Sequence, residues 1–226
     1  MSNFFAIPIT DEWGTTYQLT TAGYTALVVL MLALLLLACF IGNSVKQPKF
    51  SARQLAFSAM AMAAAFVTSE IKLFHLPFGG SITLFSMLFL VLIGYWYGLR
   101  AGLMTAIAYG FLQLVSDPYI ISIPQMLVDY IFAFGALGLS GLFSQSKNGL
   151  VKGYIAGVLG RYFFAFLSGM IFFGAYAADY GMSAPVYSLV YNGIYLSVEA
   201  VLTLIILYLP PVKKVMGQLK TMATQR

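Results

Sequence analysis

Residues 125–134 place a carboxylate inside an apolar run that is long enough to cross a bilayer. Asp129 follows Gln125 by four residues, so the two side chains share one face of a helix, and Tyr130 comes next. An acid inside a membrane segment is costly and is therefore a functional-site hypothesis, with a cation as its natural partner. The structural alternative is that the positive N-terminal end of the helix stabilises Asp129. The combination of acid, amide and aromatic ring favours binding.

A polar stripe runs down the last apolar segment of the chain. Its members follow the spacing i, i+4, i+7 and i+11 of one helix face: Ser188, Asn192, Tyr195 and Glu199. Such a stripe is expected to face protein rather than lipid. Glu199 lies deep in its segment, at a depth comparable with that of Arg161 on the preceding segment. We therefore expect a structural role for Glu199, as the partner of Arg161 in a buried ion pair.

Aromatic residues cluster where these two segments reach the same side of the membrane. Phe172, Phe173 and Tyr176 end one segment, and Tyr187 opens the next. Aromatic side chains at a membrane interface often serve only as anchors in the headgroup region. The alternative is a platform on which an aromatic ligand stacks. The sequence leaves both interpretations open.

The composition requires an integral membrane protein. The 226 residues are 61% hydrophobic and 8% charged, and the mean hydropathy is +0.88. A soluble domain carries about a quarter charged residues. A hydrocarbon core of about 30 Å needs about 20 apolar residues in a helix. We expect an all-α protein with membrane spans at about 24–42, 55–72, 82–98, 101–116, 125–143, 152–174 and 186–209.

Basic residues alternate along the chain as these spans require. They fall in the first loop, after the third span, in the fifth loop and in the C-terminal tail: Lys46, Lys49, Arg53, Arg100, Lys147, Lys152, Lys213, Lys214, Lys220 and Arg226. The positive-inside rule places these regions in the cytoplasm and the N-terminus outside. We expect a multi-pass cell-membrane protein in contact with lipid. The net charge of +5 is explained by this topology, so no nucleic-acid partner is expected.

The first span is expected to stay in the mature protein. Residues 1–23 contain no Lys or Arg, so they lack the basic region of a cleaved signal peptide. We expect residues 1–50 to form an N-terminal extracytoplasmic segment plus one extra transmembrane helix. Residues 51–226 are expected to form a six-helix substrate-binding membrane domain with a cytoplasmic C-terminal tail.

Small residues and the absence of known motifs limit the classes of function that the sequence allows. The second span has three alanine pairs four residues apart: Ala52/Ala56, Ala59/Ala63 and Ala61/Ala65. Such pairs let helices approach closely, either within the chain or against a separate membrane subunit. The chain has no Gly-rich phosphate loop, so ATP-driven work would come from another chain. Its lone His75 and lone Cys39 offer no metal site and no nucleophile with a base, so we expect no enzyme, no catalytic residues, no metal and no cofactor.

Taken together, these segments resemble the thiamine-specific substrate-binding (S) component of energy-coupling factor (ECF) vitamin transporters. The resemblance covers about residues 50–215 and rests on five stretches in the family's order: 122–130, 136–143, 161–164, 169–177 and 186–193. It implies a six-helix protein that holds thiamine, vitamin B1, at the outer membrane face. It also implies a separate energising module of one membrane coupling protein and two ATPases.

The resemblance also implies site residues. Tyr130, Tyr187 and Asn192 stand at positions where family members contact thiamine. Asp129 stands where some members have a glutamate, and Phe173 stands where others have a stacking tryptophan. With Gln125, which the helix spacing adds, the expected substrate-binding residues are Gln125, Asp129, Tyr130, Phe173, Tyr187 and Asn192.

The chain departs from the family pattern at two places. Ala165 replaces a ligand-contacting histidine, and Gly80 or its neighbours stand where members offer a tryptophan. Thiamine still fits by type, because its cationic and aminopyrimidine rings match an acid, amides and aromatic walls. The alternatives are an S component for another vitamin or a thiamine precursor, and a free-standing secondary carrier.

Overall fold

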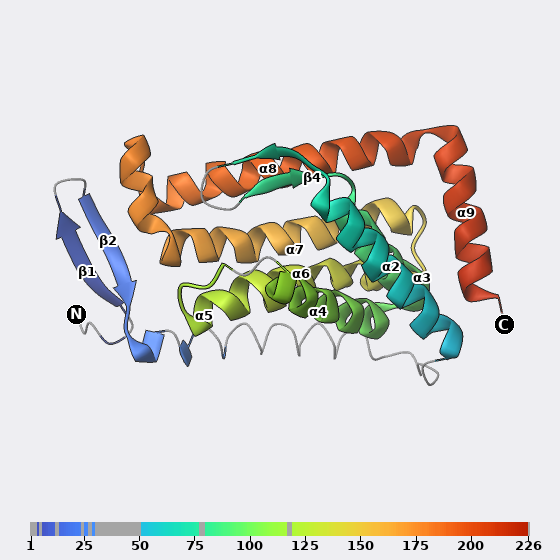
Figure 1. The fold of residues 1–226 in the computed structure, drawn as a ribbon, viewed down its shortest axis with the longest axis horizontal. Coiled ribbons are helices and arrows are strands. Elements are labelled where there is room, and N and C mark those ends of the chain that lie inside the picture. The colour runs from blue at the N-terminus through green and yellow to red at the C-terminus, as the bar shows by residue number, and fades with distance from the viewer. Residues whose placement is uncertain are drawn as a thin grey trace.

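The computed structural model describes residues 4, 6–11, 14–23, 25–26, 29, 51–76, 80–116 and 119–225. The first expected span lies almost wholly outside these residues, so the division of the chain at residue 50 stays a prediction. Near the N-terminus, β1 (Ala6–Asp11) and β2 (Gly14–Leu19) pair as an antiparallel hairpin, which the apolar pattern did not predict. Figure 1 shows this hairpin beside one end of the helices.

Six helical segments correspond to the second to seventh expected spans. They are α2 (Ala52–Glu70), α3 (Ser86–Tyr97), α4 (Leu99–Ser116), the composite segment Ile123–Phe143, α7 (Gly149–Phe172) and α8 (Ala184–Tyr208). Four of them, from α4 onward, are long and apolar enough to cross a membrane, and α3 is apolar but 12 residues long. The expected all-α membrane fold is confirmed, with α7 and α8 packed along each other (Figure 1).

The composite segment changes helix type along its length. Ser122 caps its start, and Pro124 occupies the first turn, where its missing N–H costs nothing. The segment consists of α5 (Ile123–Met126), the π-helix η2 (Leu127–Phe132), α6 (Ala133–Gly135) and the 3₁₀-helix η3 (Ala136–Phe143). Gly138 allows η3 to touch α4, because a Cβ at this position would collide with the backbone of Gly102 and Leu103.

Two short strands separate α2 from α3. β3 (Lys72–His75) and β4 (Ser81–Thr83) form an antiparallel pair. The third span was expected from residue 82, but α3 begins at Ser86. The helix starts later for two reasons. Residues 81–83 belong to β4, and Phe85 has a left-handed backbone with φ 61°, which a right-handed helix does not include.

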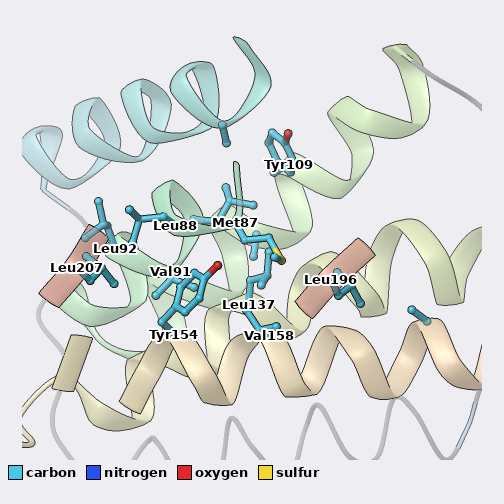
Figure 2. Packing of buried hydrophobic residues seen from close by; sticks show 14 residues of the cluster. Met87, Leu88, Val91, Leu92, Tyr109, Leu137, Tyr154, Val158, Leu196 and Leu207 are labelled. Carbon is cyan, nitrogen blue, oxygen red and sulfur yellow. The ribbon is translucent and has the colours of Figure 1, made fainter. Parts of the chain in front are cut away.

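The main core lies among α3, α4, η3, α7 and α8 (Figure 2). Its largest fully buried side chains are Met87, Leu90, Val91, Tyr109, Leu137 and Tyr154. Ala61 and Ala65 of α2 are buried in the protein, whereas Ala59 and Ala63 are exposed. The pair at 61/65 therefore serves packing within the chain, and the pair at 59/63 stays on the surface of α2.

The C-terminal tail forms a further helix, α9 (Pro210–Thr224), which turns across the end of the bundle (Figure 1). Arg53 at the start of α2 donates a hydrogen bond to the Gln225 carbonyl. Lys220 donates to the Ser144 carbonyl at 3.3 Å. Basic residues of distant loops thus gather at one end of the molecule, as the charge pattern predicted. The assignment of this end to the cytoplasm stays a prediction.

Glu199 ties α8 to the start of α3. Its carboxylate accepts hydrogen bonds from the Met87 backbone N–H at 3.0 Å, the Ser86 hydroxyl at 3.2 Å and the Thr83 hydroxyl at 2.6 Å. The N-cap residue of α3 makes no capping hydrogen bond with its own side chain. Glu199 therefore caps α3 from another helix, where its negative charge also gains from the helix dipole.

The expected ion pair between Arg161 and Glu199 is not formed, although the structure describes both side chains. The guanidinium of Arg161 lies over the Phe134 ring instead, 4.1 Å from its centroid. The start of α3 offers Glu199 three donors, so this carboxylate is satisfied without a cation. Glu199 therefore has a structural role, as expected, but its partner is the start of α3 and not Arg161.

We expect Glu199→Gln to lower the free energy of unfolding by about 1–3 kcal/mol, because an amide satisfies the α3 donors less well than a carboxylate. Arg161→Met should have a separate effect, and the double variant should equal the sum of both within about 0.5 kcal/mol. Denaturant titration of the three variants in detergent measures these values. A coupling well above 0.5 kcal/mol would show that the two side chains do interact.

Candidate functional site

A cavity of about 260 Å³ lies among α4, the composite segment, α7 and α8. All six residues expected to bind substrate are on its wall: Gln125, Asp129, Tyr130, Phe173, Tyr187 and Asn192. They come from three segments that the fold brings together. Their binding role stays a prediction, while their common location is a fact of the structure.

Gln125 holds Asp129 in place. Its amide nitrogen donates to Asp129 Oδ2 at 2.6 Å and to the Tyr119 carbonyl at 3.0 Å, and its amide oxygen accepts from the Ile121 N–H at 2.9 Å. Gln125 is 1% exposed. Both amide hydrogens and the amide oxygen thus have partners in the protein, and the group serves to orient the acid and to close the loop before α5.

Asp129 and Tyr130 lie in the π-helix η2. A π-turn takes in one extra residue and is frequent at functional sites. No Pro or Gly occurs in Leu127–Phe132, so the sequence carries no signal for it. The Tyr130 hydroxyl accepts a hydrogen bond from the Tyr119 N–H at 2.7 Å. Gly110 of α4 allows the close approach, because a Cβ there would overlap the Tyr130 carbonyl.

One aromatic wall joins the start of the composite segment to the end of α7. The ring centroids of Tyr119 and Phe173 are 5.9 Å apart at 24°, and those of Phe173 and Tyr176 are 6.1 Å apart at 29°. The two tyrosine hydroxyls share a 3.3 Å hydrogen bond. This bond and the partial burial raise the pKa of Tyr119. All three rings line the cavity, which favours a stacking platform over a lipid anchor.

A second aromatic wall follows α8. Tyr187 stacks on Tyr191 with centroids 5.5 Å apart at 25°, and Tyr191 meets Tyr195 edge-on at 5.9 Å and 70°. The three rings line the cavity. Tyr191 was not among the expected site residues, although its place near the outer end of the last span was a usable signal.

The polar stripe of α8 faces protein, as expected. Ser188, Asn192 and Glu199 are each less than 10% exposed. Asn192 donates to the Ala165 carbonyl of α7 at 3.2 Å and accepts from the Tyr195 hydroxyl at 2.9 Å. Its amide therefore links α7 to α8 as well as lining the cavity.

Gly80 and Ala165 are the two positions at which a departure from the pattern of the resembled family was expected from the sequence. The Gly80 N–H donates to the Tyr191 hydroxyl at 2.8 Å, and a Cβ at Gly80 would overlap the Tyr191 ring. A large side chain at this position and Tyr191 therefore exclude each other. Ala165 lines the cavity with its small side chain and contributes its carbonyl to Asn192.

Charged groups of both signs line the cavity. They are Glu70, Lys72, Asp129, Arg161 and Glu199. Glu199 is engaged by α3 and Arg161 by an aromatic ring, whereas Asp129 lies near the aromatic walls. Among the described residues, no three His, Cys, Asp or Glu side chains are placed to hold a metal. An oriented acid beside aromatic faces is suited to an aromatic cation.

Comparison with known proteins gives consistent matches. The family model described as "Thiamine transporter protein" matches residues 55–218. Thiamine transporter ThiT of Bacillus subtilis is 32% identical over 178 residues, which is 72% of this chain and 92% of the relative. Thiamine transporter ThiT of Lacticaseibacillus paracasei is 31% identical over 49% of this chain and 59% of its own length. A solved structure of ThiT from Listeria monocytogenes superposes with a TM-score of 0.57 at 28% identity, covering 70% of this chain and 94% of that chain.

The hydrogen bond between Tyr191 and Gly80 gives a local test. Tyr191→Phe removes the acceptor of the Gly80 N–H, so this amide should exchange its hydrogen up to about tenfold faster. Hydrogen–deuterium exchange of the peptide that contains Gly80 measures the change. Tyr195→Phe is the matched control, since its hydroxyl donates to Asn192 and does not contact this loop. Equal acceleration in both variants would contradict the assignment.

Proposed function

The chain belongs to the thiamine transporter protein family, and from this premise we propose that it captures thiamine in the cavity around Asp129. One observation carries the proposal. The carboxylate of Asp129, oriented by Gln125 at 2.6 Å, lies on the wall of a cavity that two aromatic stacks also line. No other acid in this cavity combines such an orientation with nearby aromatic faces, among the residues that the structure describes.

The groups of the site match thiamine in type. A carboxylate favours the positive charge of the thiazolium ring, and aromatic faces stabilise both the cation and the flat pyrimidine. Phe173 and Tyr187 supply a ring from each wall, and Tyr130 also lines the cavity. Gln125 and Asn192 act mainly by positioning, because their amides already have partners in the protein.

The chain is a multi-pass membrane protein, and we propose that the cavity opens to the outside. The basic residues gather at the opposite end, near α9, where the positive-inside rule places the cytoplasm. In this orientation Asp129 lies near the outer face. Its burial cost is lower there than at the middle of the bilayer.

Asp129→Asn tests the proposed role of the acid. The amide keeps the size of the side chain but removes the charge, so thiamine affinity should fall about 10- to 100-fold, as expected for loss of a partly desolvated charge contact. Isothermal titration calorimetry on the purified protein measures it. The neutral pyrimidine precursor of thiamine is the matched ligand control, and its affinity should change little. Absence of thiamine binding to the unmodified protein would remove the proposal.

We further propose that a separate energising module, made of a membrane coupling protein and two ATPases, docks on the exposed face of α2. Ala52, Ala56, Ala59 and Ala63 are exposed and follow one helix face at spacings of four, three and four residues. Small residues allow a partner helix to approach closely within the membrane. Burial of Ala61 and Ala65 inside the chain supports the choice of the exposed face as the docking surface, because the buried pair cannot contact a partner helix.

Ala59→Trp should block docking by filling the space that a partner helix needs. Co-purification of the coupling protein and ATPases from the host should fall at least about tenfold, while thiamine binding by the isolated chain stays. Val201→Trp on α8 is the control, since Val201 is also exposed, at 53%, but lies on another helix. Unchanged co-purification of the Ala59 variant would place the docking surface elsewhere.

A further inference from the structure

We propose that the side-chain amide oxygen of Gln113 is a further ligand-binding group of the cavity, which accepts a hydrogen bond from the amino group of the thiamine pyrimidine ring. This inference rests on the proposed function and deepens it, because it names the residue that recognises the neutral half of the ligand. Gln113 lies near the end of α4 and lines the cavity. None of the six residues expected to bind substrate lies on α4.

Two hydroxyl groups hold the amide nitrogen of Gln113. The nitrogen donates to Ser69 Oγ of α2 at 2.9 Å and to the hydroxyl of Tyr109, one turn earlier on α4, at 2.6 Å. Both partners line the cavity as well, so the amide group lies at the cavity wall. Both N–H groups of the amide are thereby used.

Ser69 sets the orientation of this amide. Its hydroxyl donates its single hydrogen to the Phe66 carbonyl at 2.7 Å, as serines in helices often do. Ser69 can therefore only accept from Gln113, which requires the amide nitrogen, and not the oxygen, to face it. The amide oxygen is left without a donor among the residues that the structure describes. It is an acceptor that the protein orients but does not use.

The groups that support the amide are themselves fixed. Ser69 is 9% exposed and Tyr109 is 1% exposed. The Tyr109 ring meets the Phe134 ring edge-on, with centroids 5.3 Å apart at 66°. An acceptor held in this way loses little conformational freedom when a ligand binds, which favours affinity.

Gln113 differs in this respect from the two other amides of the cavity. Gln125 uses its oxygen on the Ile121 N–H. Asn192 uses its oxygen on the Tyr195 hydroxyl. Along the part of the cavity wall that the structure describes, Gln113 is thus the amide with an oxygen left for a ligand.

The chemistry of this oxygen selects an N–H donor. The oxygen carries no full charge, so in the proposed function the cationic thiazolium ring goes to the Asp129 carboxylate instead. The pyrimidine ring of thiamine carries an amino group, which is a neutral donor with two hydrogens. A carbonyl oxygen in its place would face the Gln113 oxygen with no hydrogen between them, and an acceptor left unpaired lowers affinity. Gln113 therefore favours aminopyrimidines over their carbonyl analogues.

Gln113→Met replaces the amide by an apolar group of similar length. Isothermal titration calorimetry on the purified full chain compares thiamine, its pyrimidine precursor, and the thiamine analogue that has a carbonyl oxygen in place of the amino group. The affinities for thiamine and for the precursor should each fall about three- to tenfold, as for loss of one neutral hydrogen bond. The affinity for the carbonyl analogue should change by less than about twofold. Asp129→Asn, by contrast, should weaken thiamine binding and spare the precursor.

Two further variants serve as controls. Ser69→Ala keeps the amide oxygen but removes one of its supports, so the affinity for thiamine should fall about two- to threefold and that for the carbonyl analogue should not change. This variant carries the test if Gln113→Met fails to fold. Gln218→Met removes an exposed amide of α9 and should leave all three affinities unchanged.

The outcomes distinguish this inference from the proposed function. If Gln113→Met binds thiamine as tightly as the unmodified protein does, the inference is wrong and the proposed function stands. An equal loss for all three ligands would show that Gln113 only shapes the cavity, and a loss for thiamine without a loss for the precursor would place the amide at the thiazolium ring. Either result overturns the inference. If the unmodified protein binds no thiamine, the proposed function fails and the inference fails with it.

Discussion

Polar side chains inside the bilayer must find partners within the protein, and the arrangement of α8 depends on this constraint. Ser188 donates to the Phe166 carbonyl at 2.7 Å, Asn192 donates to the Ala165 carbonyl at 3.2 Å, and Glu199 caps α3 through the Met87 N–H at 3.0 Å. One face of one helix thus fixes α7 on one side and α3 on the other. The cavity lies where these connections hold the helices, with the tyrosines of α8 along its wall.

The proposed binding site depends on the same need of buried polar groups for partners. Gln125 uses its whole amide on Tyr119, Ile121 and Asp129, so it acts as a fixed support. Glu199 is occupied at the start of α3. Asp129 lies near the aromatic walls, and this position is the basis for the proposal that it attracts a cation. The π-turn around it supplies the unusual helix geometry that such sites frequently have.

In the proposed function, the two ends and the side of the molecule carry different tasks. The end with η4 (Gly174–Tyr180) and the aromatic walls faces outside in the proposed orientation. The opposite end holds α9 and basic residues, which the positive-inside rule assigns to the cytoplasm. The exposed alanines of α2 form the face on which we propose that the energising module docks.

The sequence alone determined the membrane class and the position of most spans, because hydrophobic length and helix periodicity are local properties. Of the six residues that meet at the cavity, the resemblance to the family implied five, and helix spacing added Gln125. Only the tertiary structure decided how Glu199 is satisfied, since depth along two helices cannot show which side chains turn toward each other. It also revealed the π-turn at Asp129, the β3–β4 pair that shortens α3, and the burial of Ala61 and Ala65 rather than Ala59 and Ala63. These features depend on contacts between distant segments, and no pattern within one segment records them.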